Sequence, residues 1–268
     1  MTSPYAAARR TPRAESLAAG VAAAYAEVMA DLPLFDDSGV QTVLCVVAHP
    51  DDMEYGGSAA VARWVEHGAH VSYLLLTAGE AGIRDKDPSE VRPLRSQEQR
   101  DACAAVGVEN LTILDLPDGM LEYGMDLRKR IAREIRKTKP DTVVTLNWGE
   151  KATWGLNQAD HRAAGLATLD AIRDADNPWV FRELMACEGL EPWGVTRLIV
   201  NGVAPDYAVE LTEANIDAAV ESLRCHKQYL SALDSHPDPK DMITEMTADT
   251  GRAAGVDHAL GIKLYELR

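Results

Sequence analysis

Short apolar runs that alternate with helical patterns are the feature that most constrains the fold of this 268-residue chain. The runs are bounded by Gly, Pro or polar residues, as buried strands are. The segments between them have helical periodicity and end near Gly or Pro. The predicted strands are 41–48, 70–76, 110–114 and 141–146, and the predicted helices are 57–67, 93–106 and 124–138. This order predicts an α/β fold, a Rossmann-like three-layer arrangement with helices on both faces of a mostly parallel sheet.

The C-terminal part of the chain predicts further strands and a helix. Segments 196–203 and 206–212 predict an antiparallel or edge pair, and 213–233 has the pattern of one amphipathic helix. We expect this part to form a small C-terminal extension that covers one side of a pocket. Because an alanine-rich helical pattern comes first, we divide the chain into an N-terminal helical lead-in, 1–38, and a single catalytic domain, 39–268.

The charge balance argues against nucleic acid as a partner, since 27 Lys and Arg face 42 Asp and Glu and give a formal net charge of −15. The most basic segment, 127–139, has apolar residues at every fourth position, so its charges form the wet face of a helix. Runs of 18 apolar residues and a secretory signal pattern are both absent from the sequence. We therefore predict a cytoplasmic protein with no membrane span and no nucleic-acid partner.

A histidine and two adjacent carboxylates follow the first predicted strand in AHPDDMEYGG, residues 48–57. The carboxyl ends of strands are where open α/β sheets bind ligands. His49 and Asp52 share one turn, and His161 opens a later helix; these three ligands suit zinc and leave a coordination position for water. Asp51 is then placed to take a proton from that water. The alternative is a simple strand-to-helix connection in which an aspartate caps the helix.

Several ordered motifs resemble those of the LmbE-like deacetylases, also called the PIG-L or N-acetylglucosaminyl-phosphatidylinositol de-N-acetylase family, over residues 40–232. The matching segments are AHPDDMEYGG (48–57), TAGEAG (77–82), Arg95 with Glu98, LPDG (116–119) and ADH (159–161). The resemblance implies zinc-dependent hydrolysis of an N-acyl group, usually acetyl, from an amino sugar. By the family pattern His49, Asp52 and His161 hold the metal and Asp51 activates water. Fe²⁺ is the alternative metal, because it also fits a site with two histidines and one aspartate.

The sequence departs from the family at the step that protonates the leaving amine. Many relatives carry a histidine three residues before the last ligand, where this chain has Gln158. Glutamine donates a hydrogen bond but supplies no proton. Either Asp51 acts first as base and then as acid, or another group contributes. His226 is a candidate, because CHKQ (225–228) resembles a stretch of relatives with one position missing; the alternative is a histidine packed between layers.

Further candidates surround the predicted metal. Asp160 precedes a ligand and is predicted to orient a ligand imidazole, to cap the helix beginning at His161, or both. Arg95 and Asp118 match positions associated with sugar recognition in the family, and an ion pair between helix and loop is the alternative.

Two acidic and two aromatic residues complete the set. Glu54 and Glu80 are predicted to gate the pocket or bind substrate, although Glu54 also suits the N-terminus of its helix. Trp148 and Trp154 lie in the long loop before the last ligand, where their rings either stack on a sugar or anchor the loop.

The combined prediction is a metal-dependent N-deacetylase or amidohydrolase acting on a linear amide, with an N-acylated amino sugar, or a metabolite that contains one, as its substrate. An amidase of a thiol-sugar conjugate is the alternative within the class, and Gln158 also admits a weakened relative that binds a sugar or a partner. A nucleotide-binding sheet is disfavoured, because two aspartates stand where a Gly-rich loop would admit a pyrophosphate. Relatives often form homo-oligomers, so a homo-oligomer is one expected form.

Overall fold

A seven-stranded sheet with the order β3-β2-β1-β4-β7-β9-β8 forms the centre of the molecule. The computed structural model describes residues 32–153, 155–233 and 235–268, so most of the predicted lead-in and Trp154 lie outside the described residues. The strands of the sheet are β1 (Thr42–Val47), β2 (His70–Leu75), β3 (Asn110–Ile113), β4 (Thr142–Leu146), β7 (Arg197–Asn201), β8 (Tyr207–Glu210) and β9 (Ala259–Glu266). A separate antiparallel pair consists of β5 (Lys151–Ala152) and β6 (Gly155–Leu156).

Strands β3, β2, β1, β4 and β7 run parallel to one another. β1 lies inside this group, where Cys45 pairs with Tyr73 of β2 on one side and with Val144 of β4 on the other. All three side chains are buried, as expected for a parallel sheet that is covered on both faces. The strands predicted from the four apolar runs are confirmed.

The predicted pairing of segments 196–203 and 206–212 is wrong. β9 lies between the strands that these segments form and is antiparallel to both β7 and β8. β7 is almost wholly buried, so its backbone N–H and C=O groups need partners on both sides, and β9 supplies the second set. β8 is left at the edge of the sheet.

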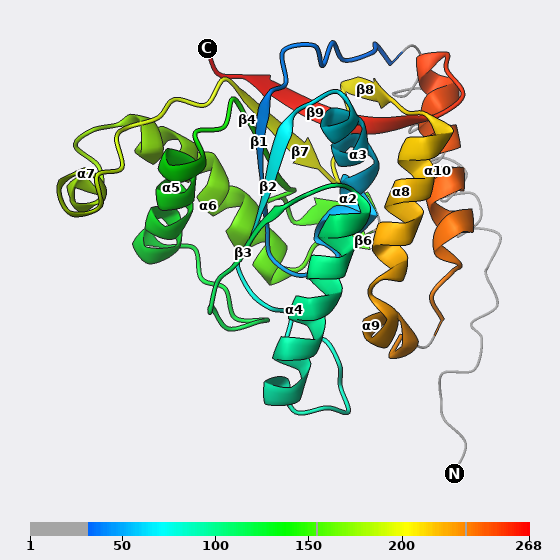
Figure 1. Ribbon diagram of the computed structural model, residues 1–268, viewed down its shortest axis with the longest axis horizontal. Helices are drawn as coiled ribbons and strands as arrows, with labels where there is room; N and C mark the ends of the chain where they lie inside the picture. The colour runs from blue at the N-terminus through cyan, green and yellow to red at the C-terminus, as the bar shows by residue number, and fades with distance from the viewer. Residues whose placement is uncertain (1–31, 154, 234) are drawn as a thin grey trace.

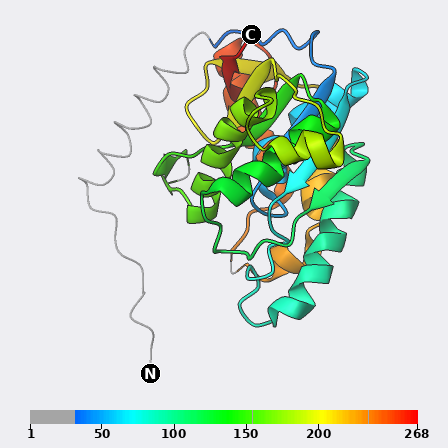
Figure 2. The ribbon, with the colours of Figure 1, turned by 90° about the vertical axis from the view of Figure 1, so that its left-hand side faces the viewer.

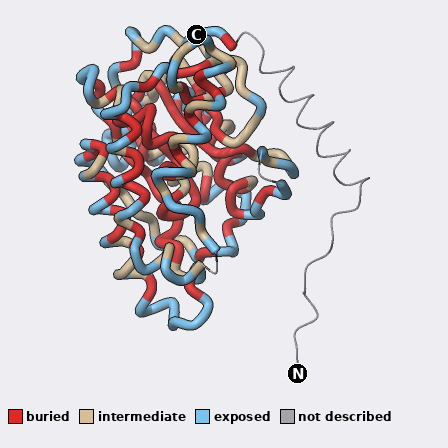
Figure 3. The backbone as a smooth tube through the Cα atoms, turned by 90° about the vertical axis from the view of Figure 1, so that its right-hand side faces the viewer, coloured by how far each residue is buried: buried red, intermediate tan, exposed pale blue. Residues whose placement is uncertain are grey.

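Helices cover both faces of the sheet, which confirms the three-layer α/β fold. They are α2 (Asp52–Gly56), α3 (Ser58–Glu66), α4 (Pro88–Ala105), α5 (Met125–Thr138), α6 (Ala159–Asp176), α7 (Arg182–Glu188), α8 (Glu213–Arg224), α9 (Lys227–Ser231) and α10 (Pro239–Ala254). Figure 1 shows α5 and α6 on one side of the sheet and α3, α4, α8 and α10 on the other. Figure 2 turns the α5 and α6 side toward the viewer, and Figure 3 shows buried segments inside and exposed turns outside. Among the described helices, none is both long enough and apolar enough to cross a membrane.

The single helix predicted at 213–233 is wrong, since the chain forms α8 and α9 with a break at Cys225 and His226. The backbone of His226 has φ −78° and ψ 47°, which is outside the helical region. Its side chain is fully buried, and the break turns it into the interior. α10, which the sequence analysis missed, packs against β9 and α8.

The topology opens a crevice between β1 and β4. The chain adds β2 and β3 on one side of β1 and then returns to add β4 and β7 on the other. At such a switch point the connections leave the two strands in opposite directions and open a crevice at their carboxyl ends. His49 follows β1 and His161 follows β4, so both histidines lie at this crevice.

Arg136 of α5 binds the C-terminal end of α6, the helix that carries His161. Its side chain is fully buried, and its Nε and Nη2 donate to the backbone carbonyls of Asp174, Ala175, Asn177 and Val180. These carbonyls lie at and beyond the end of α6, where orphan acceptors need donors. We expect Arg136→Met to lower the free energy of unfolding by about 3 kcal/mol, because it leaves buried backbone carbonyls without a hydrogen-bond donor.

Urea unfolding of the purified protein measures this effect. Arg133→Met is the matched control on the same helix, because Arg133 pairs with Glu188 at the surface. The control is expected to change the free energy of unfolding by no more than about 0.5 kcal/mol. Equal effects of the two variants would contradict the anchoring role of Arg136.

Candidate active site

The turn after β1 holds Asp51 in an unusual backbone conformation. Asp51 has φ 85°, in the left-handed region that costs a side-chain-bearing residue roughly 1–2 kcal/mol. Its N–H donates to Oε1 of Gln99 at 3.0 Å, which holds the turn against α4. Asp51 precedes α2, but its side chain makes no capping hydrogen bond. Asp51 therefore does not cap α2 with its side chain.

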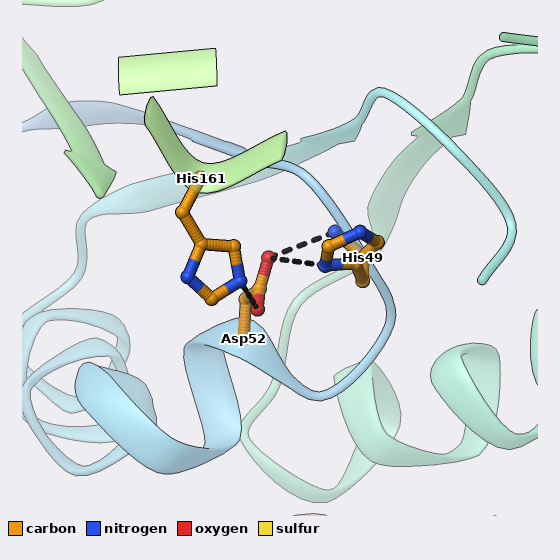
Figure 4. A group of neighbouring side chains, drawn as sticks. All are labelled: His49, Asp52 and His161. Atoms are coloured by element: carbon orange, nitrogen blue, oxygen red, sulfur yellow. Dashed lines mark hydrogen bonds and ion pairs between the residues drawn. The ribbon is translucent and has the colours of Figure 1, made fainter. Parts of the chain in front are cut away.

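The structure brings the three predicted metal ligands together. The ligand atoms of His49, Asp52 and His161 all lie within 4.8 Å of one another. Nε2 of His161 is 3.0 Å from Oδ1 of Asp52, and Nδ1 of His49 is 3.7 Å from Oδ2 of Asp52. In Figure 4 the two imidazoles approach the carboxylate from opposite sides. Two nitrogens and one carboxylate at these separations form a donor set suited to one divalent ion.

Two carboxylates hold the other side of the His49 ring. Nε2 of His49 lies 3.1 Å from Oδ1 of Asp118 and 3.2 Å from Oδ2 of Asp160. Asp160 also accepts from the backbone N–H groups of Gly119 at 2.8 Å and Leu121 at 3.1 Å. With Nε2 occupied in this way, Nδ1 is the nitrogen that faces Asp52. This arrangement is typical of metal-binding histidines.

The helix that carries His161 begins earlier than predicted. α6 starts at Ala159, and Gln158 occupies the N-cap position without a side-chain capping bond. Asp160 lies inside the first turn, and its carboxylate is used by the loop that contains Gly119. The N-cap alternative for Asp160 is therefore wrong.

The electrostatics of the cluster favour a cation. Burial opposes the charged form of His49, but Asp118, Asp160 and Asp52 outweigh it and raise the pKa of this histidine to about 12. Burial likewise opposes the charged form of Asp52, yet His161 and His49 hold its pKa well below the usual value. Carboxylates therefore dominate the site, and the residues present fit a bound divalent ion.

Arg95 lies against the predicted base. Its side chain is buried, and Nη2 is 3.2 Å from Oδ1 of Asp51. It also donates to the carbonyls of Pro50 at 2.7 Å and Gly79 at 3.1 Å. Gly79 has φ 64°, and a Cβ there would collide with Nη1 of Arg95. Arg95 thus forms its ion pair with Asp51 and not with Asp118, and a contact with sugar stays a prediction.

The pKa of Asp51 is raised to about 6. Burial is the largest cause, Arg95 opposes it, and the nearby Asp52 carboxylate adds to it. The ring of Tyr229 covers the other side of the guanidinium, with its centroid 3.9 Å from the Arg95 Cζ. Asp51 is thus a buried carboxylate beside the candidate metal ligands, with its orientation fixed by Arg95.

Glu80 and Asp118 join the loops that follow β2 and β3. Oε1 of Glu80 accepts from Arg92 at 2.7 Å and from the N–H of Asp118 at 3.3 Å. Oδ2 of Asp118 accepts from the N–H of Ala81 at 2.7 Å. Asp118 also lines the cavity described below, whereas Glu80 does not. Their predicted substrate contacts stay predictions.

His226 and Glu54 form a buried pair behind the site. Both side chains are fully buried, and Nε2 of His226 is 3.6 Å from Oε2 of Glu54. The other oxygen of Glu54 accepts from Gln99 and Ser222, each at 3.2 Å. Neither residue lines the cavity, so His226 occupies the packed position that was its alternative.

A cavity of about 660 Å³ opens over the candidate metal site. Its lining includes the predicted residues His49, Asp51, Asp52, Arg95, Asp118, Gln158 and His161. It also includes residues that the sequence analysis missed, namely Tyr55, Asn201, Tyr229, Met242 and Met246. The two methionines are four residues apart on α10, a spacing that could have signalled one helix face. Trp148 is absent from this lining. The centroid of its ring lies 6.2 Å from that of Tyr265, which favours loop anchoring.

Comparisons with known proteins agree with this geometry. A family model described as PIG-L, GlcNAc-PI de-N-acetylase, matches residues 44–172. The chain is 30% identical over 194 residues to diacetylchitobiose deacetylase of Thermococcus kodakarensis, with 70% of each protein covered. It is 31% identical over 176 residues to 1D-myo-inositol 2-acetamido-2-deoxy-alpha-D-glucopyranoside deacetylase of Kineococcus radiotolerans, covering 51% of this chain and 49% of that protein. The structure of N,N'-diacetylchitobiose deacetylase from Pyrococcus horikoshii has the same fold, with a TM-score of 0.76 at 21% identity over 93% of this chain and 92% of the other.

Proposed function

Because this chain belongs to the GlcNAc-PI de-N-acetylase (PIG-L) family, we propose that it is a metal-dependent hydrolase that removes the acetyl group from an N-acetylated amino sugar. One observation carries the proposal. Two imidazoles and a carboxylate converge within 4.8 Å at the base of a cavity, next to a second carboxylate. Three ligands with an adjacent base are the parts that metal-assisted amide hydrolysis requires.

His49, Asp52 and His161 would hold the metal, with Zn²⁺ as the first candidate and Fe²⁺ as the second. When bound, the ion supplies Lewis acidity toward the amide carbonyl and the attacking water. Asp51 takes the proton of that water, and Arg95 holds the base in orientation by the 3.2 Å ion pair. Asp118 and Asp160 fix the His49 ring. Gln158, at the cavity wall, is able to donate a hydrogen bond to the substrate.

The substrate class follows from the relatives and the cavity. The two curated relatives described above act on diacetylchitobiose and on a 2-acetamido-2-deoxy glucopyranoside. The cavity, about 660 Å³, is in the size range of sites that enclose a small molecule. A small molecule with an acetamido sugar at the metal end and a further group toward Met242 and Met246 suits this space.

Metal content and acetate release test the proposal together. The purified protein is analysed for zinc and iron and then assayed with N-acetylglucosamine, diacetylchitobiose and an acylated thiol-sugar conjugate. We expect close to one metal per chain, and acetate release that a chelator abolishes and added zinc or iron restores. Protein that takes up no metal after both ions are supplied contradicts the proposal. Metal uptake without hydrolysis of any amide favours the weakened binding relative instead.

A further inference from the structure

The proposed reaction leaves one chemical step without an assigned residue. When the C–N bond of the amide breaks, the amine nitrogen must receive a proton, since an amide anion is too poor a leaving group. The Gln158 amide donates hydrogen bonds but is not acidic enough to transfer a proton. His226 is fully buried and does not line the cavity. Two sources remain, namely the proton that Asp51 has taken from water and a second cavity residue with an exchangeable proton of its own.

We propose that Tyr55 protonates the leaving amine and that His236 resupplies its proton. The proposal rests on the proposed function and names a proton donor for the same site. Tyr55 lies in α2, one helical turn after Asp52, and lines the cavity together with Asp51 and His161. His236 lies in the segment between α9 and α10, far from Tyr55 in sequence.

The contact between the two side chains is short and specific. The Tyr55 hydroxyl lies 2.6 Å from Nε2 of His236, and the ring centroids are 5.6 Å apart at 59°. A hydroxyl both donates and accepts, so an imidazolium can donate to the Tyr55 oxygen while the phenolic proton is given to a substrate. His236 is half-buried, so its ring can exchange protons with solvent. The pair thus links solvent to the cavity wall.

Tyr229 is the other phenol in the cavity lining, but its surroundings suit a different task. Its ring covers Arg95, and burial together with the Asp51 carboxylate raises its pKa to about 12. Its hydroxyl faces the base, and no histidine is placed against it among the contacts of the described residues. Tyr229 therefore helps to hold Arg95 and Asp51, whereas Tyr55 has a proton source behind it.

The proton balance explains why both residues are needed. Burial, the Asp51 charge and the nearby Tyr229 and Glu54 raise the pKa of Tyr55 above that of an ordinary phenol, with Arg95 opposing them. The phenol alone is therefore a weak acid. An imidazolium at His236 that donates to the phenolic oxygen stabilises the phenolate, and so makes Tyr55 a stronger acid. The C–N bond breaks, the phenolic proton passes to the amine nitrogen, and the phenolate takes the Nε2 proton of His236. His236 regains a proton from water, and Asp51 releases to water the proton it removed.

The test compares an amide with an ester in the metal-loaded enzyme. The variants are Tyr55→Phe and His236→Gln, with Tyr123→Phe as the matched control because Tyr123 is exposed and bonds to Asp170. The amide is the acetamido sugar that the wild type hydrolyses best, and the ester is p-nitrophenyl acetate. Its phenolate leaves without a proton, so ester hydrolysis needs the base and the metal but no acid.

We expect Tyr55→Phe to lower kcat on the amide by about 100-fold or more and on the ester by less than about threefold. His236→Gln, which keeps a hydrogen-bonding side chain but cannot supply a proton, is expected to lower amide turnover by about tenfold with the same selectivity. Metal content stays at the wild-type value in all three variants.

Two results overturn the inference. An equal loss on amide and ester shows that Tyr55 only shapes the site, and unchanged amide turnover shows that another group donates the proton. Failure of the proposed function has a different signature, because the metal-loaded wild type then releases no acetate from any amide.

Discussion

The Asp51→Asn variant is expected to keep its metal and to lose about 10²- to 10⁴-fold in kcat on an acetamido sugar. Asparagine accepts the left-handed backbone conformation at least as well as aspartate, so φ 85° at this position is retained. Arg95 keeps its bonds to the carbonyls of Pro50 and Gly79. The change therefore removes the proton acceptor and the negative charge that pairs with Arg95, while the backbone of the turn and the other bonds of Arg95 are kept.

Acetate release under saturating substrate, together with metal analysis of the same sample, measures this loss. Asp115→Asn is the control, because that carboxylate is exposed on the loop after β3. The ester assay adds a second check, since loss of a base slows both amide and ester whereas loss of an acid slows the amide alone. An Asp51→Asn enzyme with near wild-type kcat would remove Asp51 from the mechanism.

The His161→Ala variant is expected to lose both metal and activity. The change leaves only His49 and Asp52 at a site whose three ligand atoms lie within 4.8 Å of one another. Two ligands bind a divalent ion far more weakly than three, and no hydrolysis above background is expected at stoichiometric metal. The loss should be close to complete, which makes it the largest effect predicted here.

Metal analysis after dialysis separates this outcome from simple unfolding when it is combined with circular dichroism. His67→Ala is the matched control, because His67 is an exposed histidine at the end of α3. The control should keep its metal and its activity. Retention of tightly bound metal by folded His161→Ala protein would contradict the proposed ligand set.

Local patterns were sufficient for the first part of the fold and for the three candidate ligands. The strand at 41–48 and the adjacent His49, Asp51 and Asp52 lie in one continuous segment, so the motif and its position at a strand end are read together. His161 could be added because it opens a helix after another predicted strand. Parallel topology then brings the two strand ends into one crevice.

Contacts between distant segments were out of reach. Nothing near His236 indicates that it meets Tyr55, because that contact depends on how the chain returns after α9. The position of Arg95 against Asp51 depends likewise on the packing of α4. β9 is a different case, since Leu260, Ile262 and Leu264 alternate as a strand requires and the signal was present in the sequence.

The place of β9 has a consequence for how the protein is made. β7 is bordered on one side by β4, which precedes it, and on the other by a strand that the ribosome adds much later. Until residues 259–266 emerge, β7 presents a row of unpaired backbone groups and an apolar face, a template for pairing with another nascent chain. Aggregation should therefore compete with folding during synthesis, most of all in a crowded or chaperone-poor host. Slower synthesis at lower temperature should raise the soluble yield.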